Sequence, residues 1–193
     1  MRVVAEGRVV YRRAEERDLE AVRGIDGSFT TGTVYEVVAG DGGFALREVP
    51  VDPPLVKVFP DDDDEEEGGE GDGDGGAFPG RYAEVAVDGG EVCGFVVAGV
   101  EEWHSRLVVH EITVAPAHRG RGIGAALMRR ACAYGRGLGA RTAWLETSSL
   151  NVPAVRAYRR MGFALCGLDT TFYRGTPSEG ETALFMSRPL DGP

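Results

Sequence analysis

The chain has 193 residues, of which 42% are hydrophobic and 27% charged, and its formal net charge at pH 7 is −10. This length suits roughly one domain, and it excludes two separately cored domains joined by a linker. A domain of this size can fold without disulfides or a structural metal. The three cysteines, Cys93, Cys132 and Cys166, are widely spaced and form no CxxC pair, which excludes a disulfide scaffold and a zinc finger.

No segment has the sequence of a membrane span or an export signal. The longest apolar run, residues 92–100, is about half the length that crosses a bilayer. Residues 1–13 mix charges of both signs and lack the apolar stretch of a signal peptide. Together with the cysteine pattern, these features lead us to expect a cytoplasmic protein without a membrane partner.

Most of the negative charge lies in one segment. Residues 61–74 contain ten acidic side chains and no basic one, so removing them from the sum leaves a net charge of about zero. This composition predicts an acidic flexible insertion at about residues 60–77, which is either inert and solvated or ordered by a basic ligand. The overall acidity disfavours a nucleic acid as partner, because such binding normally requires a basic patch. Only Lys57 among the 21 basic residues is a lysine.

Local patterns in the N-terminal third predict mainly extended structure. In chain order they predict a strand, a short helix, a turn-rich loop or broken helix, a hairpin and an extended proline-containing stretch: residues 7–13, 15–25, 27–33, 34–49 and 50–60. The hairpin turn is the GDGG sequence between two apolar runs. The prolines exclude a helix or a central strand in the last stretch.

After the acidic segment, the pattern predicts three antiparallel strands, a helix, a strand, a second helix and two closing strands: residues 81–87, 91–103, 106–114, 120–138, 141–147, 151–162, 163–173 and 182–188. Five apolar side chains share one face of the first helix: Ile123, Leu127, Ala131, Tyr134 and Leu138. Asn151 suits the N-cap of the second helix, and Gly162 suits its end. The sum is an α/β fold class, a single domain with a mixed, mostly antiparallel sheet flanked by helices.

The motif with the clearest chemistry follows the third of these strands. Two arginines and three glycines open the predicted helix: Arg119, Gly120, Arg121, Gly122 and Gly124. Glycines let the backbone approach a ligand closely, and the free N–H groups of a first helical turn attract an anion. With the arginines nearby, a pyrophosphate is the expected occupant. The alternative is a glycine-loosened turn with solvated arginines, since the motif is neither a Walker A loop nor a Rossmann fingerprint.

A second motif follows this loop after about 27 residues, with the sequence Asn151-x-x-Ala154-x-x-x-Tyr158-x-x-x-Gly162-Phe163. The two motifs, in this order and on these predicted elements, resemble the GNAT superfamily of N-acetyltransferases. The resemblance implies a GNAT-like fold and acetyl-CoA as co-substrate, without a metal.

The resemblance also assigns roles to individual residues. It implies that the backbone of residues 119–124, including Ile123, holds the pyrophosphate of acetyl-CoA. It implies further that the strand end at Val114 pairs with the pantetheine arm and polarises the thioester carbonyl. Asn151 would contact the same arm, although a plain N-cap is an equally good interpretation. Tyr158 would point at the sulfur atom, where the alternative is an aromatic side chain packed on a helix face.

Further segments are similar to the streptothricin (nourseothricin) acetyltransferases. They are GSFTT, FALREVPVDPPLVKVFPDD, WLET and AYRRMGFALCGLDT, which with the acidic run span nearly the whole chain. Members of that family inactivate streptothricin by acetylating an amine of its β-lysine side chain. The resemblance therefore implies a cationic small-molecule antibiotic as substrate and antibiotic resistance as the outcome.

A substrate amine with a pKa near that of lysine, about 10.4, is mostly protonated at neutral pH, so the reaction requires a base. Glu111 and Glu146 are acidic residues in predicted strands, where apolar residues are expected. Either could take the proton, directly or through water, while the other binds a cationic group. We favour Glu111 as the base and Tyr158 as the acid for the leaving thiolate. Asp169 and Tyr173 are substrate contacts by resemblance only.

The cysteines and histidines are expected to have no catalytic role. Two cysteines lie in predicted strands and one in a predicted helix, so all three are expected to pack in the core. The histidines, His104, His110 and His118, have neither metal-ligand spacing nor a pattern of carboxylate partners, and we expect no metal. His110 is a weaker candidate for a proton relay, because it alternates with Glu111 and points to the opposite face.

Two other functions remain open on the sequence. The same fold could acetylate another amine, such as a polyamine, an aminoglycoside or a protein N-terminus. It could also bind acetyl-CoA without catalysis while the acidic segment docks a basic partner, although a module that only binds would need neither Glu111 nor Tyr158. The sequence does not fix which amine reacts, which glutamate is the base, or the oligomeric state, and a homodimer is compatible with it.

Overall fold

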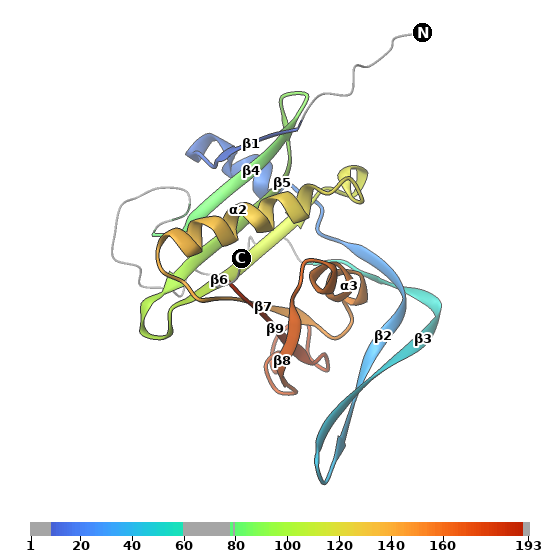
Figure 1. The fold of residues 1–193 in the computed structure, drawn as a ribbon. Coiled ribbons are helices and arrows are strands. Elements are labelled where there is room, and N and C mark those ends of the chain that lie inside the picture. The colour runs from blue at the N-terminus through green and yellow to red at the C-terminus, as the bar shows by residue number, and fades with distance from the viewer. Residues whose placement is uncertain (1–8, 60–77, 79, 191–193) are drawn as a thin grey trace. The chain divides into compact units, whose positions relative to one another are not determined.

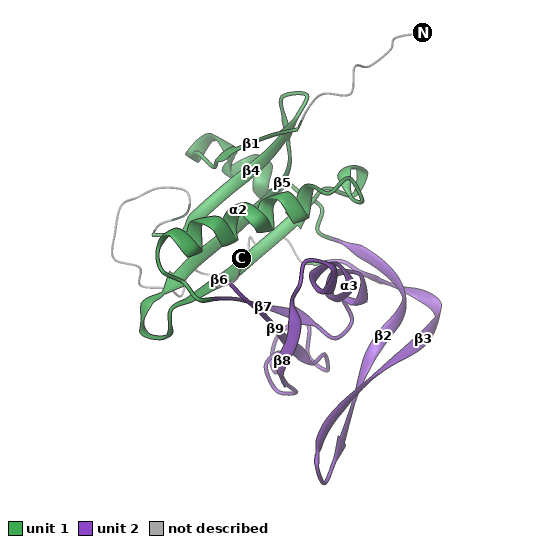
Figure 2. Cartoon of the chain, in the orientation of Figure 1, with its two compact units in different colours: residues 1–27, 59–141 green, residues 28–58, 142–193 purple. Residues whose placement is uncertain are grey.

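The computed structural model describes residues 9–59, 78 and 80–190. The chain forms two compact units, each built from two separate stretches (Figure 2): residues 1–27 with 59–141, and residues 28–58 with 142–193. The acidic insertion predicted at about residues 60–77 lies outside the described residues. Among the residues that are described, no helix is long and apolar enough to cross a membrane.

Unit 1 is an antiparallel sheet with a helix on each face. Its strands stand in the order β1–β4–β5–β6: Val10–Arg13, Tyr82–Asp88, Glu91–Glu101 and Arg106–Val114. The long helix α2 (Ile123–Gly137) lies across β4, β5 and β6 (Figure 1). The short helix α1 (Leu19–Arg23) contacts β5 after the 3-10 turn at Glu16–Asp18.

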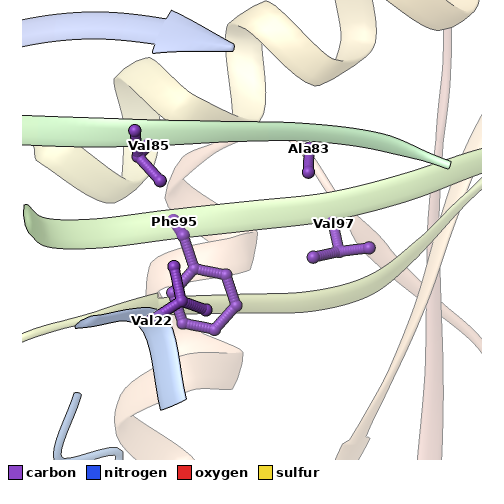
Figure 3. Packing of buried hydrophobic residues seen from close by; sticks show 5 residues of the cluster. All are labelled: Val22, Ala83, Val85, Phe95 and Val97. Atoms are coloured by element: carbon purple, nitrogen blue, oxygen red, sulfur yellow. The ribbon is translucent and has the colours of Figure 1, made fainter. Parts of the chain in front are cut away.

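The face under α1 has a small hydrophobic cluster of its own (Figure 3). Val22 of α1 packs against Ala83 and Val85 of β4 and against Phe95 and Val97 of β5. The strand residues alternate, so they point to the same face of the sheet. All five side chains are buried, which anchors the short helix even though its own length makes it marginal.

Helix α2 covers the other face with a stripe that differs at its end from the predicted one. The first three predicted positions are buried, but Leu138 is 58% exposed, so its place in the core stripe was wrong. The helix ends at Gly137 and Leu138 becomes its C-cap residue. Gly135 lies against Leu107 of β6 instead, since a glycine allows the closest approach of helix to sheet.

Unit 2 consists of a small antiparallel sheet, a long hairpin and one helix. The sheet order is β7–β9–β8: Thr142–Ser148, Ala183–Pro189 and Ala164–Asp169. The hairpin consists of β2 (Phe29–Gly40) and β3 (Gly43–Lys57), and α3 (Val152–Arg160) contacts β2. The Arg159 side chain donates a hydrogen bond to the Tyr35 hydroxyl at 3.1 Å, and the Tyr35 N–H donates to Ser149 O at 2.9 Å.

The predicted hairpin is confirmed, but it is longer than expected. The prediction of a loop or broken helix at residues 27–33 was wrong, because β2 begins at Phe29 and Phe29 pairs with Lys57. Cross-strand pairing with buried Phe29 and Thr31 outweighs the local turn preference of this segment. The prolines of β3 are tolerated because this two-stranded sheet leaves strand edges without ladder partners.

The close approach of α2 to β6 gives a test of packing. A Cβ atom at Gly135 would lie 3.0 Å from Leu107, which is fully buried, whereas one at Gly137 would meet nothing within 4 Å. Both changes to alanine remove a helical glycine, so the difference between them isolates the steric cost. We expect the free energy of unfolding of Gly135→Ala to lie about 1–3 kcal/mol below that of Gly137→Ala. Equal urea midpoints for the two variants would show that the core yields at this point.

Candidate active site

Helix α2 begins with backbone that only glycine adopts easily. Gly120 and Gly122 have φ angles of 76° and 81°, in the left-handed region, and Gly122 is the N-cap without a side-chain cap. The first hydrogen bond of the helix runs from Ala126 N to Gly122 O at 3.0 Å. In the described part of the chain, the N–H groups of residues 120–122 have no backbone acceptor. Several donors therefore remain for a ligand at this helix end.

The space beside these donors is open. A Cβ atom at Gly120 or Gly122 would meet nothing within 4 Å, while one at Gly124 would touch Val114 Cγ2 at 3.6 Å. Within the described residues, a helix N-terminus with these N–H groups and no acidic residue in its first turn fits an anion. This loop is therefore compatible with a pyrophosphate, the ligand predicted from the sequence.

The two arginines of the loop hold the loop itself. Arg119 donates from Nε to Val114 O at 2.8 Å and from Nη2 to Asp26 O at 3.0 Å. Arg121 forms an ion pair at 2.9 Å with Asp88, the last residue of β4. These contacts fix the strand end and the glycine turn relative to each other, so the backbone donors are held in place before a ligand arrives.

Two histidines lie beside carboxylates, contrary to the prediction that they lack such partners. His118 Nε2 is 3.5 Å from Asp88, and His104 Nε2 is 3.4 Å from Glu101. Neither pair gathers further ligands, and the described residues contain no group of three or more side chains that could hold a metal ion.

Glu111 lies next to a bulge in β6 that the sequence pattern does not reveal. Glu111 pairs with Val97 and Val109 pairs with Ala98, which leaves His110 as an extra residue. Because paired residues share a face, Glu111 lies on the face that carries Val97 and helix α1, and its side chain is exposed. The bulge breaks the alternation from which opposite faces were predicted for His110 and Glu111. Burial lowers the pKa of His110, with a smaller effect from Arg81, which favours its neutral form.

Helix α3 in unit 2 carries the second motif. The Asn151 side chain accepts a hydrogen bond from Ala154 N at 3.1 Å, so it caps the helix, and this contact leaves its NH2 group for other partners. Tyr158 is partly buried and forms a tilted contact with Phe163, with ring centroids 6.1 Å apart. Burial, with a contribution from the charge of Glu146, raises the pKa of Tyr158 to about 12. The hydroxyl therefore stays protonated across the physiological range.

Glu146, in the middle of β7, is a carboxylate in a partly desolvated position. The Tyr173 hydroxyl donates a hydrogen bond to it. Burial raises the pKa of Glu146 above its ordinary value, the Tyr173 hydrogen bond opposes this, and the nearby charge of Glu181 raises it further. The pKa of Tyr173 is raised in turn, first by burial and then by Glu146. The structure thus joins two predicted substrate residues into one hydrogen-bonded pair.

Glu181 is a further acidic residue of this region that the sequence analysis did not identify. Lys57 pairs with one carboxylate oxygen and Ser148 donates to the other, while Lys57 also donates to Ser178 Oγ at 3.0 Å. The Lys57 and Glu181 side chains are only 15% and 9% exposed. The sequence feature that could have pointed to this ion pair is that Lys57 is the single lysine of the chain. Glu181 is therefore a neutralised, structural carboxylate, unlike Glu146.

Asp169, a predicted substrate contact, and Cys166, a predicted core residue, are not part of the Glu146–Tyr173 pair. Asp169 is half-buried and accepts hydrogen bonds from the backbone N and the hydroxyl of Thr171, both at 2.7 Å, which lower its pKa. This is the geometry of an Asx-type turn. Cys166 is exposed, so its predicted place in the core was wrong, and its sulfur lies 3.4 Å from Phe185 O. Cys93 and Cys132 are buried as predicted.

Comparison with known proteins establishes the family. Residues 45–163 match the acetyltransferase (GNAT) family, which is more than half of the chain. The chain therefore belongs to the GNAT family and is an acetyltransferase, and the predicted GNAT-like α/β fold class is confirmed.

Individual relatives are similar over nearly the whole chain. The streptothricin acetyltransferase of Streptomyces lavendulae is 54% identical, covering 93% of this chain and 94% of the relative. The crystal structure of a nourseothricin acetyltransferase has 50% identity and a TM-score of 0.84, covering 94% of this chain and 98% of that one. A Bacillus anthracis protein described as a streptothricin acetyltransferase, in complex with acetyl coenzyme A, shares the fold at 23% identity and a TM-score of 0.76, covering 95% and 99%.

The environment of Glu146 makes a prediction about stability and pH. Because its native pKa lies above the ordinary value of about 4.5, the native state binds this proton more tightly than the unfolded chain does. Stability from this group is then lost as pH rises from about 4.5 through the native pKa. The glutamine of Glu146→Gln can still accept a hydrogen bond from Tyr173 but cannot ionise. We therefore expect the free energy of unfolding of Glu146→Gln to exceed that of the wild type at pH values above the native pKa of Glu146. Below about pH 4.5 the two free energies should be equal.

Urea unfolding between pH 4 and pH 8 measures this difference. Glu36→Gln, at an exposed carboxylate of the same unit, is the control and should keep the wild-type profile. A Glu146→Gln protein that is less stable than the wild type at pH 8 would show that the ionised carboxylate stabilises the fold.

Proposed function

We propose that this acetyltransferase moves the acetyl group of acetyl-CoA to an amine of the β-lysine moiety of streptothricin-class antibiotics, and thereby confers resistance to them. The observation that carries the proposal is the 54% identity with a streptothricin acetyltransferase over 93% of the chain. The nourseothricin acetyltransferase at 50% identity supports the same substrate class. A coenzyme A release assay over a panel of amines tests it, with streptothricin expected to be the best substrate. A polyamine, an aminoglycoside or an N-terminal peptide reacting faster would overturn the assignment.

The glycine loop is the proposed binding site for the pyrophosphate of acetyl-CoA. The backbone N–H groups of residues 120–124 would hold it at the N-terminus of α2, and the open space at Gly120 and Gly122 would admit it. Arg119 and Arg121 would act mainly by holding the loop, through their hydrogen bonds and ion pair. Val114 at the strand end and the NH2 group of Asn151 would contact the pantetheine arm.

We assign the base to Glu111, acting directly or through water. Its carboxylate is exposed and follows the bulge in β6. The substrate ammonium gives its proton to Glu111, and the free amine attacks the thioester carbonyl. A C–N bond forms, the C–S bond breaks and coenzyme A leaves as a thiolate, while the nitrogen loses its second proton to solvent, which in turn protonates the thiolate.

Tyr158 is the proposed partner of that thiolate. With a pKa of about 12, its hydroxyl is a reliable hydrogen-bond donor at neutral pH. Complete proton transfer to the thiolate, whose conjugate thiol has an ordinary pKa of about 8.5, would be uphill, so the hydroxyl stabilises the developing charge chiefly through a hydrogen bond. Glu146, held by Tyr173, would receive another cationic group of the substrate rather than the reacting amine.

The pyrophosphate assignment predicts the effect of a side chain at Gly122. We expect Gly122→Val to weaken acetyl-CoA binding at least tenfold, because a β-branched residue disfavours the left-handed backbone and occupies the open space. Calorimetry measures the affinity. Gly139→Val is the control, since Gly139 has a φ angle of 83° and equally open space at the other end of α2. Unchanged affinity in a folded Gly122→Val protein would place the phosphate elsewhere.

The role of Tyr158 predicts a loss of turnover without a loss of cofactor binding. We expect Tyr158→Phe to lower kcat by about 10- to 1000-fold while acetyl-CoA affinity stays within about twofold. Tyr35→Phe, which removes a hydroxyl that accepts from Arg159 of the same helix, controls for a displaced α3. If kcat is unchanged under conditions where chemistry limits the rate, Tyr158 has no part in the departure of the thiolate.

A further inference from the structure

The sheet of unit 2 has one buried face and one partly exposed face. Leu145 of β7 and Met186 of β9 are 1% and 0% exposed and form the buried side. Trp144 and Glu146 alternate with Leu145, and Glu146 is the direct cross-strand partner of Phe185. Paired residues share a face, so the carboxylate and the Phe185 ring lie together on the partly exposed side.

Contacts between aromatic rings link the strands that form this partly exposed face. The Trp144 and Phe185 ring centroids are 5.3 Å apart, and Phe172 meets Phe185 edge to face at 5.9 Å. Phe172 also meets Tyr173 edge to face at 5.2 Å, and the Tyr173 hydroxyl returns to Glu146. These contacts therefore link β7 to β9, and β9 to the segment after β8. The Tyr173 hydrogen bond then links that segment back to Glu146 of β7.

These aromatic residues and Glu146 have features that a simple hydrophobic core lacks. Phe172 is 51% exposed although two other rings hold it in place. Gly167 of β8 pairs with Phe185, and a Cβ atom there would lie 3.4 Å from the ring, so the glycine leaves it room. Within the described residues, the hydrogen-bond partner of Glu146 is the uncharged Tyr173, whereas Glu181 already has the ammonium of Lys57.

We propose that Trp144, Phe172, Phe185 and Glu146 form a subsite for an ammonium group carried on a methylene chain, with Phe172 as a specificity-determining residue. The inference deepens the proposed function and rests on it, since β-lysine has this chemistry. The rings accept the apolar methylene stem, and their faces attract a cation. The partly desolvated carboxylate accepts the ammonium, which for this subsite is a second, non-reacting one.

Simple alkylammonium ions test the subsite. Their binding to the full chain is measured by NMR titration, and their inhibition of streptothricin acetylation is measured in parallel. We expect n-pentylammonium to bind wild type at least tenfold more tightly than methylammonium, because only the longer ion has a stem for the rings. The uncharged 1-pentanol should bind at least tenfold more weakly than n-pentylammonium, because it has no charge for Glu146.

The variants separate the rings from the carboxylate. Phe172→Ala should weaken n-pentylammonium about tenfold, raise KM for streptothricin by a similar factor and leave kcat within about threefold, while methylammonium binding changes less than twofold. Glu146→Gln should weaken both ammonium ions and leave 1-pentanol unchanged. Phe44→Ala is the matched control, because this phenylalanine of the same unit is 58% exposed and lies near the start of β3, paired with Ala39 of the hairpin.

The outcomes distinguish this inference from the function on which it rests. Equal binding of n-pentylammonium to wild type and Phe172→Ala, or equal losses for the long and the short ion, would overturn the subsite. The subsite is also overturned if Phe44→Ala weakens n-pentylammonium as much as Phe172→Ala does. A wild type that binds n-pentylammonium as expected but does not acetylate streptothricin would overturn the proposed function and leave the subsite intact.

Discussion

The proposed anion site of unit 1 depends on the turn that connects β6 to α2. Two glycines with left-handed backbone make this turn, and no side chain caps the helix that follows. Arg119 ties the turn to the carbonyl of Val114, and Arg121 ties it to Asp88. A row of backbone donors is therefore rigid before any ligand binds, which reduces the entropy that binding must overcome.

Unit 2 shows two glutamates in opposite electrostatic situations. The Glu181 side chain is only 9% exposed and is engaged by Lys57 and Ser148, as a stable charge in such a position requires. Glu146 is partly removed from water, but within the described residues its hydrogen-bond partner is a phenol, and its pKa is raised. A carboxylate kept in such a position is typical of a binding or catalytic site, where function is maintained at some expense of stability.

Much of the fold follows from local pattern. The hairpin at residues 82–101, a helix from Gly120 and the Asn151 cap were all predicted, because alternation, glycine and capping side chains act over a few residues, although the helix begins at Ile123. The strand at Phe29, the exposure of Leu138 and the exposure of Cys166 were not. Each of them depends on a partner element that is distant in sequence, or on where a helix ends.

The sequence by itself determined the family and the position of the glycine loop at residues 119–124, because motifs consist of nearby positions, and the catalytic residues named from it stay predictions. Only the tertiary structure decided how the side chains are placed. The bulge at His110 sets the face of Glu111, and strand register places Glu146 opposite Phe185. Lys57 reaches Glu181 across 124 positions of sequence. Register and long-range pairing arise from packing of the whole chain, so no local pattern encodes them.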